Sequence, residues 1–197
     1  MSTHPTTRFY IGAFGVIVMI AAILAANYVT TSYGFIPIGF GLQATAGTVF
    51  AGFALASRDA IQDTWGKWPV VGVILVGTLL SFLISAPAIA FASAVAFLLA
   101  EALDFAVYVP LREKAKLGDK RWAAAVVVSN VVGSVTDTIV FLGLAFGAAA
   151  ILPALPGQIV GKMYATVLYL LIGVTIARFL RERLRERREA PTEKGQW

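Results

Sequence analysis

Long apolar runs separated by short polar segments make up most of the chain. Five of these runs exceed the roughly 18 apolar residues that mark a membrane-spanning helix, and a sixth, around 36–57, is longer but rich in glycine. The predicted spans are Phe9–Thr31, Ile36–Ser57, Pro69–Ser85, Ala88–Pro110, Trp122–Phe146 and Gln158–Leu180. We therefore predict an all-α membrane protein, a six-transmembrane-helix bundle over residues 9–180, flanked by an N-terminal tail (1–8) and a basic C-terminal tail (181–197).

The second predicted span, Ile36–Ser57, is a weak helix former. Gly39, Gly41, Gly47 and Gly52 all fall within it, and a glycine costs a helix about 1 kcal/mol relative to alanine. A membrane tolerates such a segment only where neighbouring elements or a cavity satisfy its backbone. Two interpretations follow: the segment is broken or re-entrant near Gln43, or it is an ordinary helix that packs closely through its glycines.

The composition narrows the class of protein. Charged residues make up 14% of the chain, against about a quarter in soluble domains. The chain has no cysteine, and its one histidine is His4 in the N-terminal tail, so we expect neither a thiolate or histidine metal site nor a cofactor. The first span is too long for a signal peptide and lacks an Ala-x-Ala cleavage site, so we expect it to be retained.

The basic residues predict the orientation. Every Lys and Arg except Lys162 lies at a helix end or in a connection that falls on one side of the membrane if six helices alternate. An excess of Lys and Arg marks the cytoplasmic side, so both termini and the loops 58–68 and 111–121 are predicted to be cytoplasmic, in a multi-pass protein of the cell inner membrane. The tail should meet anionic lipid headgroups. The net charge of +5 therefore reflects topology, and no nucleic-acid partner is expected.

Polar and aromatic residues inside the apolar runs are the candidate substrate-binding residues, because an ionisable group there costs roughly 2.5–3.5 kcal/mol and usually lines a cavity or pairs. Counting about 1.5 Å per helical residue from the basic residues at the cytoplasmic helix ends gives the depth of each one in the membrane. The polar residues fall into a tier in the inner half of the membrane and a tier in the outer half, and aromatic residues lie on the same helix faces. The inner tier is Glu101, Asp104 and Asn130, the outer tier is Gln43, Asp137 and Lys162, and the aromatic residues are Phe97, Tyr108 and Phe141.

Some of these residues have a second interpretation. Lys162 either extends to the outer surface or pairs with Asp137, which lies at a matched depth, and Asn130 either binds substrate or bridges two helices. Glu101 could be the structural partner of a donor. A purely structural role for both Glu101 and Asp104 is less favoured, because the chain has few buried cations to neutralise them.

Three segments together resemble a known family. They are "IPIGFGLQATAGTVFAGFALASRDAIQDTWGK", "FASAVAFLLAEALDFAVYVPLR" and "SNVVGSVTDTIVFLGLAFG", and over about residues 10–180 the chain resembles the VUT family of vitamin-uptake or queuosine-precursor transporters. The matching positions are Arg58, Asp59, Glu101, Asp104, Tyr108, Pro110, Asn130 and Asp137. The second predicted span, Ile36–Ser57, differs from the corresponding part of those family members that tend to carry a Pro-rich motif there.

The resemblance implies a six-helix inner-membrane protein that imports 7-deazaguanines such as preQ0 and preQ1. It also implies kinship with the S-components of energy-coupling-factor transporters, but transport without their ATPase. A carboxylate could accept the N1 and 2-amino hydrogens of such a base as a bidentate pair. Asn130, Gln43 or Lys162 could donate to O6, and Phe97, Tyr108 or Phe141 could stack on the ring.

Three other functions compete with this one. The first is an S-component-like vitamin-binding subunit that requires an ATPase module, and the second is a structural membrane subunit. The third, an intramembrane aspartyl protease using Asp104 and Asp137, is disfavoured because no Gly-x-Gly-Asp sequence is present and the two acids lie about 12 Å apart in depth. We therefore predict that the chain is not an enzyme. The sequence leaves open whether it acts alone or as a homo-oligomer.

Overall fold

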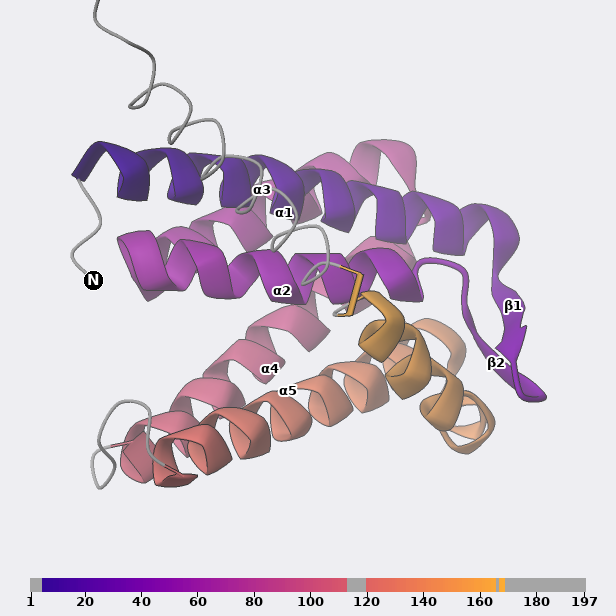
Figure 1. The fold of residues 1–197 in the computed structure, drawn as a ribbon. Helices are drawn as coiled ribbons and strands as arrows, with labels where there is room; N and C mark the ends of the chain where they lie inside the picture. Colours follow the sequence, from indigo (N-terminus) through magenta and orange to yellow (C-terminus); the bar gives the residue numbers. More distant parts are fainter. Residues whose placement is uncertain (1–4, 113–119, 166, 169–197) are drawn as a thin grey trace, which may run out of the picture.

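The structure, a computed structural model, describes residues 5–112, 120–165 and 167–168 (Figure 1). Its elements are α1 (Pro5–Tyr33), β1 (Phe35–Gly39), β2 (Leu42–Thr45), α2 (Thr48–Trp65), α3 (Lys67–Ile84), α4 (Pro87–Arg112), α5 (Lys120–Phe146) and the 3-10 helix η1 (Ala148–Ala150). A further helix over 151–165 follows η1. The described part of the chain is therefore mostly helical, as predicted.

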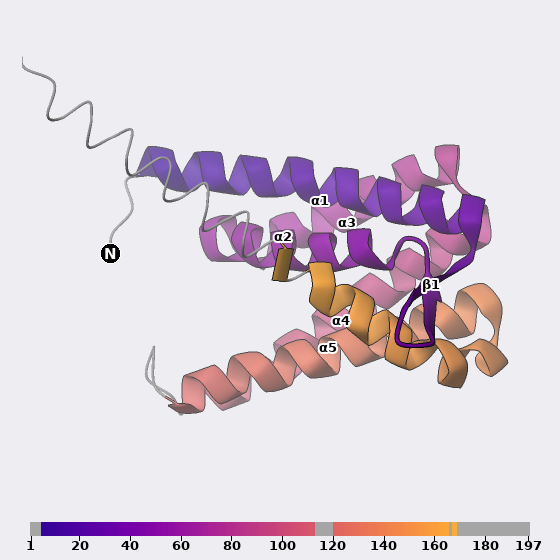
Figure 2. The same ribbon diagram turned by 45° about the vertical axis from the view of Figure 1, so that its right-hand side comes forward.

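The helices form two groups that meet near one end of the molecule. α1, α2 and α3 pack together, and α4 and α5 run side by side as a second pair (Figures 1 and 2). The hairpin of β1 and β2 lies at one end of α1 and α2, whereas the start of α1, the end of α4 and the start of α5 lie at the opposite end (Figure 1). The helix over 151–165 lies on the hairpin's side of the molecule, close to α2 (Figure 2).

Two of the described helical segments are long and apolar enough to cross a membrane. They are Phe9–Tyr33 and Lys67–Ile84, and shorter apolar helical segments cover Pro87–Leu103 and Val131–Phe146. Large apolar side chains such as Leu79 and Leu83 of α3 are exposed on the outside of the molecule. A bilayer would cover such a surface, because lipid tails are as apolar as these side chains.

The prediction of one helix over Ile36–Ser57 is wrong, because its first part is a β-hairpin. β1 pairs antiparallel with β2, with Phe35 opposite Thr45 and Gly39 opposite Leu42. The connection is Phe40-Gly41, and both residues have positive φ, 56° and 70°, as a type I′ two-residue turn requires. The break lies near Gln43, as the first of the two interpretations states, but the segment there is extended and not re-entrant helix.

The second interpretation, close packing through glycine, holds for the remaining helix. A Cβ on Gly47, just before α2, would clash with the carbonyl oxygen of Ala26 in α1. A Cβ on Gly52 would lie 2.5 Å from the Cβ of Ala165. These glycines let α2 approach α1 on one side and the helix over 151–165 on the other, which brings their polar side chains within bonding distance.

Several predicted boundaries also change. α2 continues to Trp65, and Gly66 alone, with φ of 88°, separates it from α3, so most of the predicted loop 58–68 is helical. α1 begins at Pro5, inside the predicted tail 1–8. The final helix is already formed at 151–157, before the predicted start at Gln158. Most of the predicted span Gln158–Leu180 lies outside the described residues, as does the tail 181–197.

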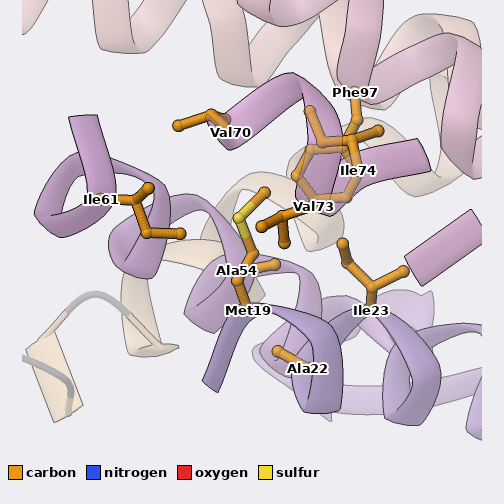
Figure 3. Close-up of a cluster of buried hydrophobic side chains, with 9 residues drawn as sticks. All are labelled: Met19, Ala22, Ile23, Ala54, Ile61, Val70, Val73, Ile74 and Phe97. Atoms are coloured by element: carbon orange, nitrogen blue, oxygen red, sulfur yellow. The ribbon is translucent and has the colours of Figure 1, made fainter. Parts of the chain in front are cut away.

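An apolar cluster fixes the three-helix group against α4. Its buried members are Met19, Ala22 and Ile23 of α1, Ala54 and Ile61 of α2, Val70, Val73 and Ile74 of α3, and Phe97 of α4 (Figure 3). The side chains of α1 and α3 converge on Ala54, whose small size leaves room for them. Because Phe97 belongs to this cluster and lies one turn from Ser93, the packing also positions the polar site described next.

Candidate substrate-binding site

A small polar cavity lies where the two helix groups meet. Its lining comes from α1 (Ala26, Asn27, Thr30), β2 (Thr45), the residue before α2 (Gly47), α2 itself (Ala51), α4 (Ser93, Phe97), α5 (Asp137, Thr138, Phe141) and the helix over 151–165 (Gln158, Lys162). Its volume is about 20 Å³, which is room for about one water molecule. Of the predicted site residues on α4 and α5, Phe97, Asp137 and Phe141 therefore face a common space, whereas Glu101 does not line it.

A buried ion pair forms one wall of this cavity. Nζ of Lys162 donates to Oδ2 of Asp137 at 2.5 Å and to Oγ1 of Thr138 at 2.7 Å, and the carbonyl oxygen of Ser134 lies at 3.4 Å. Asp137 and Lys162 are each only 5% exposed, so both ions depend on these bonds in place of water. The predicted pairing is confirmed, and the surface-anchor interpretation of Lys162 is wrong.

A ring of three side chains borders the cavity through two of its members, Thr45 and Gln158. The hydroxyl of Thr48 donates to Oε1 of Gln158, Nε2 of Gln158 donates to Oγ1 of Thr45 at 2.8 Å, and the two threonine oxygens are 3.0 Å apart. The hydroxyl hydrogen of Thr48 is already used, so Thr45 must be the donor to Thr48 and the ring closes. The ring joins β2, α2 and the helix over 151–165.

The residues of this ring were not predicted as site residues. Thr45 and Thr48 lie within the predicted span Ile36–Ser57, and Gln158 is only the first residue of the last predicted span. One signal was available, because Gln158 and Lys162 are four residues apart and therefore lie on one face of a helix. The pairing of Gln158 with two threonines more than 100 positions away was not visible in the sequence.

Two further bonds tie α1 to the site. The backbone N–H of Gly47 donates to Oγ1 of Thr30 at 3.1 Å, and Nδ2 of Asn27 donates to Oγ of Ser81 in α3 at 2.9 Å. All of these side chains are buried. Because an unsatisfied buried polar group costs about 1–3 kcal/mol, these bonds hold the α1 side of the cavity in one arrangement.

A second buried ion pair lies away from the cavity. Nη1 of Arg58 in α2 is 3.0 Å from Oε2 of Glu101 in α4. Arg58 follows Thr48 by ten residues, which is about 15 Å along α2, and Glu101 does not line the cavity. The geometry therefore favours the interpretation of Glu101 as a structural partner. The placement of Arg58 in a loop was wrong, because it is a buried helical residue.

The other predicted residues divide into three groups. Phe97 and Phe141 line the cavity as expected. Gln43 is exposed on β2 and does not line it. Its backbone carbonyl instead packs against Gly157, where a Cβ would clash with it. The side chains of Asp104, Tyr108 and Asn130 lie outside the part of the chain that the structure describes.

An aromatic chain connects the hairpin with the cavity. The rings of Phe35 in β1 and Phe146 at the end of α5 have centroids 4.8 Å apart, and Phe146 lies 6.1 Å from Phe141 in an edge-to-face arrangement. These separations are typical of favourable aromatic pairs. Phe141 therefore supplies an aromatic surface to the cavity and at the same time supports the hairpin through Phe146.

Comparison with known proteins identifies the family. Residues 13–179 match the family described as "Putative vitamin uptake transporter". The chain belongs to this family. The matched range contains every residue that lines the cavity, and together with the apolar helices it makes the chain a membrane protein of the uptake-transporter class. Searches of curated proteins and of solved structures find no significant match.

Proposed function

We propose that this family member is a multi-pass inner-membrane transporter that imports a queuosine precursor, a 7-deazaguanine such as preQ0 or preQ1, and that the base binds in the cavity between the helix groups. The observation that carries the proposal is the buried Asp137–Lys162 pair beside the Gln158 amide and two phenylalanine rings. The substrate class itself comes from the resemblance in the three sequence segments.

The lining offers what such a base requires. Asp137 can accept a hydrogen bond from the 2-amino group, Lys162 can donate to the ring nitrogen N3, and Phe97 and Phe141 supply apolar contact for the ring. The charges of Asp137 and Lys162 cancel, which suits a neutral heterocycle with donors and acceptors on its rim. This favours preQ0, which is neutral, over preQ1, whose aminomethyl group is protonated at neutral pH. A vitamin with a free carboxylate would instead bring an uncompensated charge into a buried site, at a cost of several kcal/mol.

Binding of a base requires the surrounding elements to separate. The cavity of about 20 Å³ is far below the roughly 300–1,000 Å³ of a typical ligand pocket. The arrangement described here is therefore too compact to hold a base, and we refer to it as the closed arrangement. We propose that transport alternates between this arrangement and open ones in which the two helix groups move apart.

Uptake of labelled preQ0 and preQ1 tests this function. In queuosine-auxotrophic cells we expect expression of the chain to restore uptake and queuosine in transfer RNA, and we expect the Asp137→Asn variant to lose both. Proteoliposomes that hold only the purified chain should also accumulate the base. Uptake in cells but none in proteoliposomes would favour the S-component alternative, and no uptake in either would contradict the proposal.

The proposed topology can be tested with single cysteines, because the native chain has none. Tyr33→Cys and Pro156→Cys, both at exposed positions near the hairpin end, should react with an impermeant maleimide added outside the cell. Trp68→Cys, which is exposed at the start of α3, should react only after the membrane is permeabilised. The reverse pattern would place both termini outside and contradict the orientation derived from the basic residues.

A further inference from the structure

Gln158 lines the cavity, and two hydrogen bonds fix its side-chain amide. It is only 2% exposed, and its amide is held between two threonines: Oε1 accepts from Thr48 and Nε2 donates to Thr45. The threonine pair thus offers the amide one donor and one acceptor side by side. A cis-amide group, such as the N1–H and C6=O edge of a lactam, offers the same pair of groups.

Neither charged residue of the site can by itself bond to both groups of such an edge. An ionised Asp137 only accepts and Lys162 only donates, and they satisfy each other at 2.5 Å. The amide of Gln158 carries one acceptor and one donor in a single plane, so it can form two parallel bonds with a lactam edge. Nothing in its charge would favour a cationic or an anionic ligand.

We propose that Gln158 determines the specificity of the site by pairing with a cis-amide edge of the substrate, and that Thr45 and Thr48 occupy the place of that edge in the closed arrangement. The inference rests on the proposed function for the location of the substrate. It adds the residue that recognises the lactam edge of the substrate. A ligand without the edge would leave the buried amide unpaired, and sites that depend on such bonds discriminate strongly against analogues that lack them.

The test compares two ligands that differ at this edge. In 2-amino-6-chloro-7-deazapurine, chlorine replaces O6 and N1 carries no hydrogen, whereas 7-deazaguanine has the intact lactam. We expect the purified full-length wild-type protein to bind 7-deazaguanine at least about 10-fold more tightly by titration calorimetry, since each lost bond is worth about 1 kcal/mol. The Gln158→Met variant, nearly equal in size, should bring this ratio close to 1, because it weakens binding of the lactam alone.

Two further variants make the test specific. Gln62→Leu removes an amide from α2 that does not line the cavity, and it should leave the ratio unchanged. Gln158→Asn keeps the amide but withdraws it by one methylene, and it should lose the ratio as Gln158→Met does. Oγ1 of Thr45 and Oγ1 of Thr48 are 3.0 Å apart, so we expect each threonine to keep a partner in both variants of Gln158. Gln158→Asn serves if Gln158→Met does not fold.

The outcomes separate this inference from the proposed function. If the wild type binds both ligands but does not distinguish them, or if the preference survives in either folded variant of Gln158, the inference is overturned and the proposed function stands. If the wild type binds neither ligand, the 7-deazaguanine function fails and the inference fails with it. A preference that is present in the wild type and in Gln62→Leu but lost in the variants of Gln158 supports it.

Discussion

Replacing Lys162 by Met is expected to lower the free energy of unfolding by about 3–5 kcal/mol, the usual cost of removing one partner of a buried ion pair. The change leaves the Asp137 carboxylate buried without the ammonium that now contacts it at 2.5 Å, and it also removes the bond to Thr138. Uptake should be lost as well, because the stranded charge lies in the lining of the cavity.

A double-mutant cycle measures this coupling. Asp137→Asn and Lys162→Met should each destabilise the protein in mixed detergent micelles, and the double variant should recover part of the loss, because no uncompensated ion remains. Lys67→Met is the matched control. Lys67 lies at the start of α3 with its ammonium 5.5 Å from the ring centroid of Trp68, so its loss should cost about 1 kcal/mol or less. Strictly additive losses for Asp137 and Lys162 would mean that the two residues do not interact.

Glu101→Gln is expected to cost a similar amount, about 3–5 kcal/mol of unfolding free energy, but to leave ligand affinity nearly unchanged. The substitution keeps the shape of the side chain and removes the charge that Arg58 contacts at 3.0 Å between α2 and α4. Glu101 lies outside the cavity lining. Its contribution should therefore be to the association of the two helix groups and not to recognition of the substrate.

Measuring stability and affinity on the same variant decides between the two interpretations of Glu101. Chemical denaturation gives the free energy of unfolding, and calorimetry with 7-deazaguanine at a temperature where the variant is folded gives the Kd. Arg58→Met should show the same combination, and Arg58→Lys should show a smaller loss, because lysine keeps the charge without the planar guanidinium. A Kd that rises more than about 10-fold in Glu101→Gln, with little loss of stability, would instead place Glu101 against the substrate.

The helices and one ion pair of the site were predictable from the sequence. Apolar runs indicate where a chain can be buried in lipid or protein, so most helix positions could be predicted from them. Asp137 and Lys162 could be paired in advance because each is costly alone and both lie at a similar distance from the basic helix ends. Phe97 and Phe141 followed from their helical spacing to polar residues.

The sequence by itself therefore determined a mostly helical membrane protein, its family and the chemistry of its most costly buried charges. Only the tertiary structure decided that residues 35–45 form a hairpin, that Arg58 neutralises Glu101, and that Gln158 joins Thr45 and Thr48. The physical reason is that periodicity and depth are properties of a single element. They give the face of the helix on which a side chain lies and its depth in the membrane. Which faces meet depends on contacts between distant elements, and here the close approaches at Gly47, Gly52 and Gly157 set those contacts.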